Sequence, residues 1–481
     1  MKFFVSLFTA KLPFYYTYML QQVEYNPSKF WAWTHRLIEG NESVKSVMTR
    51  KTLVTTNRAK LLLCAGYSYF VLILILSLLI FALSMNWLSI IFSLFFWTLT
   101  SVLTLAIFYY FLSGFAFLLV VKPQQKKLLK EASKIFSEHN GLKIAVLGSY
   151  GKTTFKEMLV TVLSEGLNVA VTPGNMNVST SHARFAKKLS GNEEVLIVEF
   201  GEGGPGDIER MAKMFKPDFA IITGLAPNHL DLYPNLSGIA VDLLSIYDFV
   251  DSQNVFVNGE SKMLKEFLPA NAQTYNSDGL LDWQTKNIKV SVNNLKFDVN
   301  KNNKATVVVN SELLGRHQVA PLCLVVAIAD KLGLDTKTIE LGLSKTKPYE
   351  HRMQPRLVQG AWLIDDTYNG NLEGLQAGLR LLSDLPAKRK WYVTPGLVDQ
   401  GDETERVHIE LGKSIAECNP DILVLMQNSV CKIIQKSCKE NGFTGEIRIE
   451  PVPLNFYTNI EHVIAVGDLV LMQNDWTDNY S

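Results

Sequence analysis

A short glycine-rich motif, Gly148-Ser-Tyr-Gly-Lys-Thr-Thr154, carries the residues of this chain that are best suited to chemistry. It follows the apolar run 142–147 and opens a stretch of helical pattern. Backbone N–H groups in such a turn, with the helix N-terminus behind it, bind phosphate oxygens, while Lys152 adds a positive charge and Thr153 a hydroxyl for Mg²⁺. We expect the nucleotide to contact Gly148, Ser149, Tyr150, Gly151, Lys152, Thr153 and Thr154.

The motif is shorter than the usual P-loop, because only Ser149 and Tyr150 separate Gly148 from Gly151. The alternative interpretation is a glycine-rich turn that binds no nucleotide. A strand before the motif, a helix after it and the Lys-Thr-Thr run favour the phosphate site.

Two downstream strand ends carry groups that could hold a metal. Glu199 ends the apolar run 195–199, and His229 and Asp231 lie in the loop after the run 219–223. Open α/β sheets bind ligands at the carboxyl ends of their strands, and phosphoryl transfer needs a bound metal. The alternatives are a solvated glutamate and a surface histidine.

The elements that must position these groups are apolar strands separated by helical patterns, which predict a parallel sheet covered on both faces. A more polar stretch, 287–309, alternates in the β manner and predicts hairpins at one edge. A second α/β series follows Leu314-Gly-Arg-His317, so we expect a domain boundary near Gly315. The predicted strands are 144–147, 169–172, 195–199, 219–223 and 255–258, then 362–364, 391–394, 422–425 and 469–471.

Composition excludes some classes of protein. The 481 residues suggest about three units, and a formal charge of +1 implies no nucleic-acid partner. The five cysteines are scattered, which predicts reduced thiols and disfavours a zinc ribbon.

Two apolar runs, 61–81 and 88–121, each exceed the ~20 residues needed to cross a bilayer. Neither run has a polar face, which disfavours the alternative of a buried core hairpin. Lys and Arg flank the pair on both outer sides, at Arg58 and Lys60 and at Lys122, Lys126, Lys127 and Lys130. The positive-inside rule therefore predicts a multi-pass protein of the inner (cytoplasmic) membrane whose catalytic domains lie in the cytoplasm.

Two details of this region are also expected. Ser113-Gly114 could kink or end the second run, and residues 1–20 form an interfacial segment rather than a signal peptide or a third span. The predicted organisation is a basic N-terminal segment (1–60), two transmembrane helices (61–121), a linker helix (122–139), a nucleotide-binding domain (140–315) and a C-terminal domain (316–481).

Five motifs occur in the order and at the spacing of one family. They are Gly148–Thr154, Glu199-Phe-Gly201, Asn228-His-Leu-Asp231, Leu314-Gly-Arg-His317 and Ile364-Asp-Asp-Thr-Tyr-Asn-Gly-Asn371. From about residue 140 onward the chain resembles the Mur ligases, and most of all the MurF branch. The resemblance implies a P-loop central domain with a parallel sheet and a Rossmann-like C-terminal α/β domain, here preceded by a membrane helical hairpin.

The resemblance also implies an activity. Mur ligases use ATP and Mg²⁺ to phosphorylate a carboxylate, and an amine then displaces phosphate to form an amide in a cell-wall precursor. The implied partners are ATP, an envelope precursor, an amino acid or dipeptide such as D-Ala-D-Ala, and the membrane. The implied catalytic residues are Lys152, Glu199, His229 and Arg352, and the implied metal ligands are Thr153, Glu199 and His229. Asp366 and Asn369 would bind nucleotide, and Asn175, Asn177 and Asn371 would bind substrate.

The chain departs from the family pattern at several places. Leu243 stands where the family usually has a carbamylated lysine that helps to hold a second metal, with Asp242 as a neighbouring carboxylate. Gln318 and Pro321 replace asparagines that help to hold the base, and Leu471-Met-Gln-Asn-Asp-Trp476 lacks the family's lysine near the end.

The largest departure is at the front, where the basic segment and the hairpin replace a domain that grips a UDP-linked sugar. We therefore expect an acceptor that is carried on a lipid or delivered at the membrane. The alternatives are a carboxylate-activating enzyme of the MurT or CapB type, and a membrane scaffold that keeps the fold without catalysis.

Overall fold

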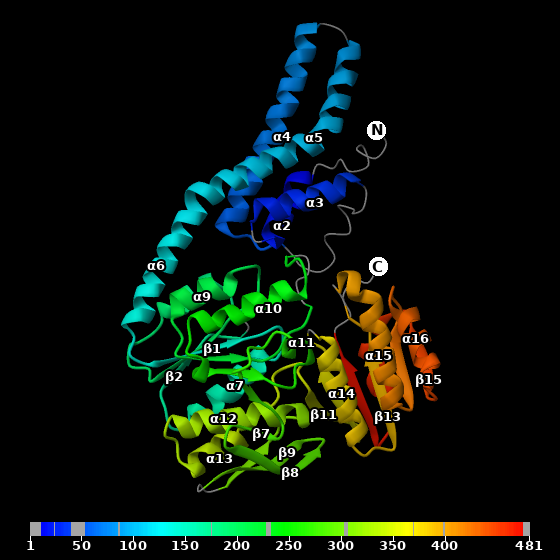
Figure 1. The fold of residues 1–481 in the computed structure, drawn as a ribbon. Helices are drawn as coiled ribbons and strands as arrows, with labels where there is room; N and C mark the ends of the chain where they lie inside the picture. Colours follow the sequence, from blue (N-terminus) through cyan, green and yellow to red (C-terminus); the bar gives the residue numbers. More distant parts are fainter. Residues whose placement is uncertain are drawn as a thin grey trace. The chain divides into compact units, whose positions relative to one another are not determined.

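The computed structural model describes residues 11–23, 25–39, 53–84, 87–174, 176–227, 232–302, 306–368, 370–397 and 400–474. The chain forms two compact units, Met1–Leu128 and Leu129–Ser481 (Figure 1). Each unit has its own hydrophobic core.

The first unit is helical. Its elements are α2 (Leu12–Gln22), α3 (Pro27–Glu39), α4 (Asn57–Ser84), α5 (Trp87–Ala116) and the π-helical turn η2 (Phe117–Val121), which leads into α6 (Lys122–Glu138). Helix α2 packs on α4, and α3 packs on α5. Aromatic side chains fill this core, where the Tyr16 hydroxyl donates to the Val102 carbonyl at 2.8 Å and the Tyr109 hydroxyl to the Leu62 carbonyl at 3.0 Å.

The predicted break between the apolar runs is confirmed, because α4 ends at Ser84 and α5 begins at Trp87. The second helix continues through Ser113-Gly114, and its hydrogen-bond pattern changes only at Phe117–Val121. By length and composition Asn57–Leu76 and Val102–Glu138 could cross a membrane, and only 22% of each apolar window is buried. That exposure disfavours a buried core hairpin.

The second unit contains a six-stranded parallel sheet in the order β2-β3-β1-β4-β5-β6. Its strands are β1 (Leu142–Leu147), β2 (Val169–Val171), β3 (Val195–Glu199), β4 (Phe219–Ile222), β5 (Val255–Asn258) and β6 (Gln273–Tyr275). The five predicted strands are confirmed. The short strand β6 was missed because Gln-Thr-Tyr has no apolar run.

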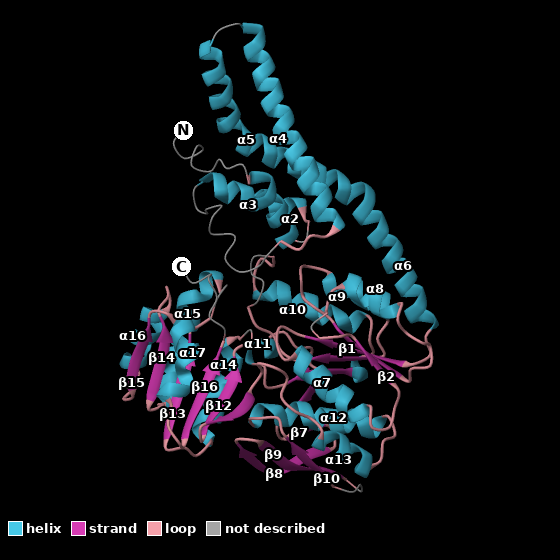
Figure 2. Ribbon diagram, turned by 180° about the vertical axis from the view of Figure 1, so that it is seen from behind, coloured by secondary structure: helices cyan, strands magenta, loops and turns pink. Residues whose placement is uncertain are grey.

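Helices cover both faces of this sheet (Figures 1 and 2). They are α7 (Lys152–Leu163), α8 (Ser179–Ala186), α9 (Asp207–Phe215), α10 (Leu236–Leu244), the short α11 (Lys262–Lys265) and α12 (Val319–Lys331), and α13 (Thr336–Ser344) packs on α7 and α12. Figure 1 shows α9 and α10 on one face and α7 and α12 on the other. Ile144 and Val146 point into the α7–α12 core, as alternation along β1 requires.

The predicted β-hairpins form a separate antiparallel sheet rather than an edge of the parallel one. The strands β7 (Gly279–Leu280), β8 (Trp283–Ser291), β9 (Asn294–Lys301) and β10 (Val307–Ser311) pair in the order β10-β9-β8-β7. Helix α12 contacts β7, β8 and β9 as well as α7. Since α12 and α13 share this core, we propose that the domain boundary lies after Ser344 rather than near Gly315.

A third sheet, in the order β11-β12-β16-β13-β14-β15, follows. Its strands are β11 (Gln354–Val358), β12 (Ala361–Asp366), β13 (Arg389–Thr394), β14 (Ile422–Met426), β15 (Glu446–Glu450) and β16 (Asp468–Gln473). All pairs are parallel except β11–β12. Helices α14 (Leu372–Asp384), α15 (Thr404–Cys418) and α16 (Cys431–Glu440) pack on one face, and α17 (Pro453–Val463) packs on the other (Figure 2). The four predicted strands are confirmed, and the edge strands β11 and β15 were missed.

Candidate active site

The glycine-rich motif is a tight turn between β1 and α7. Gly148 has φ +133° and Gly151 has φ +75°, a region that favours glycine. A Cβ on Gly148 would lie 2.5 Å from the Thr223 hydroxyl, so the turn packs closely against the end of β4. Gly151 is the N-cap of α7, which leaves the first helical N–H groups facing the turn. This geometry can bind phosphate oxygens.

Glu199 lies beside Thr153, another of the predicted metal ligands. The Thr153 hydroxyl donates to Glu199 Oε2 at 3.0 Å, and the Asn177 amide donates to Oε1 at 3.4 Å. Glu199 is 1% exposed. A hydroxyl and a carboxylate are the hard oxygen ligands that Mg²⁺ prefers, so this pair fits the ion.

The metal ligand set is not complete in the part of the chain that the structure describes. No group of three or more His, Cys, Asp or Glu side chains converges there. Three residues predicted for the site, His229, Asn175 and Asn369, lie outside the described residues. Their roles stay predictions.

Lys156 is a component of the site that the sequence did not reveal. Its side chain is fully buried, and its ammonium lies 3.3 Å from Glu199 Oε2. The same ammonium donates to the Thr172 carbonyl at 3.0 Å and to the Gly174 carbonyl. Buried charges must be paired and hydrogen-bonded. Lys156 therefore connects α7 to Glu199 through an ion pair and to the loop after β2 through hydrogen bonds.

His182 fixes the same strand end. Its Nε2 lies 2.8 Å from the Glu199 backbone carbonyl, and burial lowers the pKa of His182 to about 4. At neutral pH the ring is uncharged and donates one N–H to that carbonyl. Glu199 is thus held through its backbone as well as its carboxylate.

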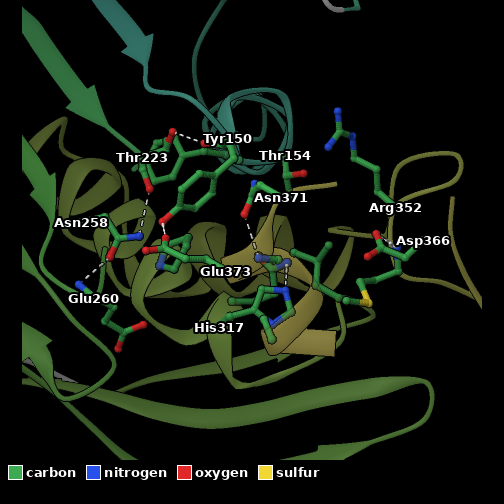
Figure 3. A pocket seen from close by; sticks show the side chains of 18 of the residues that line it. Tyr150, Thr154, Thr223, Asn258, Glu260, His317, Arg352, Asp366, Asn371 and Glu373 are labelled. Atoms are coloured by element: carbon green, nitrogen blue, oxygen red, sulfur yellow. Dashed lines mark hydrogen bonds between the residues drawn. The ribbon is translucent and has the colours of Figure 1, made fainter. Parts of the chain in front are cut away.

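A cavity of about 230 Å³ opens beside the glycine-rich turn. It lies between the middle and C-terminal sheets, and its lining includes Tyr150, Thr154, Asn258, His317, Arg352, Asp366, Asn371 and Glu373. Figure 3 shows Tyr150 and Glu373 pointing toward each other, with Asn258 and Glu260 on one side and Arg352 and Asp366 on the other. The glycine-rich turn and the C-terminal residues implied by the family resemblance therefore share one cavity.

Tyr150 and Glu373 join the two sides of this cavity. The Tyr150 hydroxyl donates to the Glu373 carboxylate, across 223 residues of sequence. Burial raises the pKa of both groups. Glu373 stands in the first turn of α14, where the helix dipole favours a negative charge. Sequence separation of this size explains why the contact was not predicted.

Asp366 and Arg352 lie at the other end of the cavity. Asp366 accepts a hydrogen bond from the Met353 N–H at 3.1 Å and from the Gln473 amide at 2.8 Å. The Arg352 guanidinium stacks on the Tyr368 ring at 4.2 Å. Burial raises the pKa of Asp366 to about 6, and the nearby Arg352 partly offsets that rise.

This pKa leads to a testable pH dependence. Because the folded-state pKa of an acid is raised, its ionised form is disfavoured in the fold, and the associated stability falls as pH rises from 3.8 to about 6. If the Asp366 carboxylate accepts a ribose hydroxyl, nucleotide affinity should instead weaken as pH falls through about 6. We expect titration of ADP at several pH values to show this loss, and Asp366→Asn to bind more weakly but with a flatter profile. An unchanged profile in Asp366→Asn would exclude Asp366 as its source.

Asn371 and Asn177 have structural partners as well as the predicted substrate roles. The Asn371 side chain caps α14 by accepting from the Gly374 N–H at 2.9 Å. The Asn177 backbone carbonyl accepts from the Gly201 N–H at 2.8 Å. Asn371 lines the cavity, whereas Asn177 lies beside Glu199.

Leu243 and Asp242, at and beside the position of the family's carbamylated lysine, both have structural roles in the fold. Leu243 is fully buried. Asp242 accepts from the Gly206 N–H at 2.9 Å and from the Tyr233 hydroxyl at 2.7 Å, so both carboxylate oxygens already have partners. This arrangement does not support Asp242 as a replacement metal ligand.

Of the other departures, Gln318 lines the cavity, whereas Gln473 and Asn474 bond to residues that line it. Gln318 Nε2 lies 2.9 Å from His317 Nε2, and burial lowers the pKa of His317 to about 4, so the ring is neutral at pH 7. Near the chain end, Gln473 donates to Asp366, and the Asn474 side chain accepts from the Gly370 N–H at 3.2 Å. The amide side chains of Gln473 and Asn474 therefore hold the end of β12 and the loop after it. They belong to the segment that lacks the family's lysine.

Comparison with known proteins agrees with this geometry. The family model for the Mur ligase middle domain matches residues 146–329. This part of the chain is therefore similar to a Mur ligase middle domain. The UDP-N-acetylmuramoyl-tripeptide–D-alanyl-D-alanine ligase of Escherichia coli is 26% identical over 285 residues, which are 56% of this chain and 61% of that protein. The ligase of the same name from Synechocystis is 29% identical over 290 residues, 59% of this chain and 62% of that protein.

Solved structures show the same fold over a longer stretch. MurF from Acinetobacter baumannii aligns with a TM-score of 0.64 at 21% identity, covering 73% of this chain and 77% of that one. MurF ligase from Thermotoga maritima, solved in complex with ADP, aligns with a TM-score of 0.63 at 22% identity, covering 73% and 80%. The chain thus has the Mur ligase fold, although it spans only about three fifths of the length of the curated relatives named above.

Proposed function

We propose that this protein is an ATP-dependent carboxylate–amine ligase of the MurF type. The observation that carries the proposal is the contact of Thr153 with Glu199 beside the glycine-rich turn that carries Lys152, next to a cavity that Arg352 and Asp366 also line. ATP and Mg²⁺ are the proposed cofactors. The ADP bound in the Thermotoga MurF structure supports nucleotide binding by this fold.

The proposed reaction has two steps. A carboxylate oxygen of the acceptor attacks the γ-phosphorus of ATP, which forms an acyl phosphate and releases ADP. The amine then attacks the acyl carbon, inorganic phosphate leaves, and the nitrogen loses a proton as the amide forms. Lys152 and the N–H groups of the glycine-rich turn would stabilise negative charge on the transferred phosphoryl group. Mg²⁺, held by Thr153 and Glu199, would neutralise phosphate charge.

The proposed substrates follow from the names of the relatives and from the first unit. Those relatives are named as tripeptide–D-alanyl-D-alanine ligases, so we propose an envelope precursor as acceptor and a dipeptide such as D-Ala-D-Ala as amine. The apolar helices α4 and α5 support a multi-pass location in the cytoplasmic membrane, with a lipid-linked acceptor. Tethering would raise the local concentration of such an acceptor.

The test uses the full chain reconstituted in nanodiscs with ATP and Mg²⁺. ADP release and hydroxamate formed with hydroxylamine report the acyl phosphate, first with a lipid-linked precursor and then with a soluble UDP-linked one. Each acceptor is combined with L-Ala, D-Ala or D-Ala-D-Ala. We expect acyl phosphate with an acceptor, and amide only with the correct amine.

Each result has a defined meaning. Equal rates with the soluble and lipid-linked acceptors would contradict delivery at the membrane while leaving the ligase proposal intact. Absence of nucleotide binding would contradict the ligase proposal and favour a scaffold.

A further inference from the structure

The helical unit contains a cavity of about 440 Å³ that the proposed ligase reaction does not use. It lies where the α2–α3 turn, the first turn of α4, η2 and the start of α6 meet. Its lining residues are Gln22, Val23, Tyr25, Asn26, Lys29, Arg58, Phe117, Val121 and Gln125.

The charged residues that line this cavity are all positive. Lys29 and Arg58 are its two charged lining residues in the described chain, and no carboxylate lines it there. Neither side chain forms an ion pair with another described residue. The Arg58 guanidinium lies over the Tyr25 ring at 5.4 Å from its centroid, a cation–π contact that does not use its N–H groups. Two cations are thereby available to an anion.

The backbone around Lys29 is held in a defined shape. Tyr25 has φ +60°, an uncommon conformation for a residue other than glycine, and its N–H donates to the Leu20 carbonyl at 2.6 Å. The Asn26 side chain accepts from the Ser28 and Lys29 N–H groups at 3.0 and 3.2 Å. Gln21 donates to the Val54 carbonyl at 2.8 Å and accepts from the Val54 N–H at 2.9 Å. These bonds fix the turn next to the start of α4.

One side of the cavity is apolar, where Phe117 and Val121 of η2 line it. No residue of η2 (Phe117–Val121) is buried, and Leu118 and Leu119 are each 59% exposed. The first apolar span begins at Asn57, next to Arg58. The cationic wall and the apolar wall therefore meet where both helices of the hairpin reach their basic flanks, at Arg58 and Lys122.

We propose that this cavity binds the phosphate headgroup of a membrane lipid, with the acyl chains lying against Phe117–Val121. Lys29 and Arg58 contact the phosphate, and two cations favour a headgroup that carries two negative charges. This inference rests on the proposed membrane insertion of the hairpin and is independent of the ligase reaction.

The experiment uses the full chain purified in neutral detergent, without ATP or amine. Binding of dioleoyl phosphatidic acid and dioleoyl phosphatidylcholine is measured by native mass spectrometry. In the cavity variant, Lys29→Gln with Arg58→Gln, we expect phosphatidic acid affinity to fall by about 30-fold. In a matched control, Lys60→Gln with Lys127→Gln, the same charge is removed from exposed residues outside the cavity, and we expect a loss below about threefold.

The double variant Lys29→Arg with Arg58→Lys preserves both charges and should keep most of the phosphatidic acid affinity. Retained affinity in this variant would show that the loss in the glutamine variant comes from the missing charges rather than from misfolding caused by substitution at these positions. Equal losses in the cavity variant and the control would overturn the proposal, because they would indicate diffuse attraction. Equal binding of phosphatidic acid and phosphatidylcholine by the parent, or displacement of phosphatidic acid by inorganic phosphate at similar concentration, would also overturn it.

Discussion

Lys152→Ala is expected to lower acyl-phosphate formation and ATP turnover by about 10³-fold. The lysine stands at the first position of α7, directly after the turn whose N–H groups would hold the phosphates. In the free protein its ammonium donates to the Gly148 carbonyl and forms no ion pair with a carboxylate of the described chain. The charge is therefore available to the phosphoryl group, and its removal should have little effect on folding.

The control for this variant is Lys213→Ala, which removes an exposed lysine paired with Glu209 on α9. We expect that variant to keep parent activity, since exposed pairs contribute ~1 kcal/mol or less. Both proteins should unfold at the same temperature as the parent. Parental rates of acyl-phosphate formation in Lys152→Ala would show that the glycine-rich turn is not the phosphate site.

The contrast between Lys152 and Lys156 shows what sequence reasoning can reach. Lys152 was predicted because its neighbours form a local motif whose turn and helix follow from adjacent residues. Lys156 lies four residues later, on the same face of the helix, and that spacing was the available signal. Its burial depends on Glu199 and the loop after β2, which only the folded sheet brings together.

The same distinction applies to the fold. Apolar central strands were predicted because burial on both faces demands continuous Val, Ile and Leu. Edge strands such as β11 and β15 were missed, since solvent on one side relaxes that demand. The position of the antiparallel sheet depends on α12, which arrives later in the sequence and covers it. The Tyr150–Glu373 contact depends on the packing of α14 beside the glycine-rich turn, which no local pattern predicts.

Replacing Lys156 with methionine is the second large effect we expect. Methionine keeps much of the side-chain volume of lysine, but it leaves the Glu199 carboxylate buried without its ammonium partner. Because removing one partner of a buried ion pair costs about 3–5 kcal/mol, we expect the free energy of unfolding to fall by that amount. The Thr172 and Gly174 carbonyls also lose a donor. Urea unfolding followed by fluorescence should show the loss, whereas Lys187→Met, which removes an exposed lysine paired with Glu131, should cost less than ~1 kcal/mol.

A double variant separates stability from catalysis at this position. Lys156→Met with Glu199→Gln removes both charges, so we expect it to recover part of the lost stability, with a coupling energy of ~1–3 kcal/mol. Activity should not recover, because the neutral amide is a poorer ligand for Mg²⁺ than the carboxylate. If Lys156→Met unfolded at the same urea concentration as the parent, the buried pair would not be a stabilising contact. Equal activity of the double variant and the parent would instead remove Glu199 from the proposed metal site.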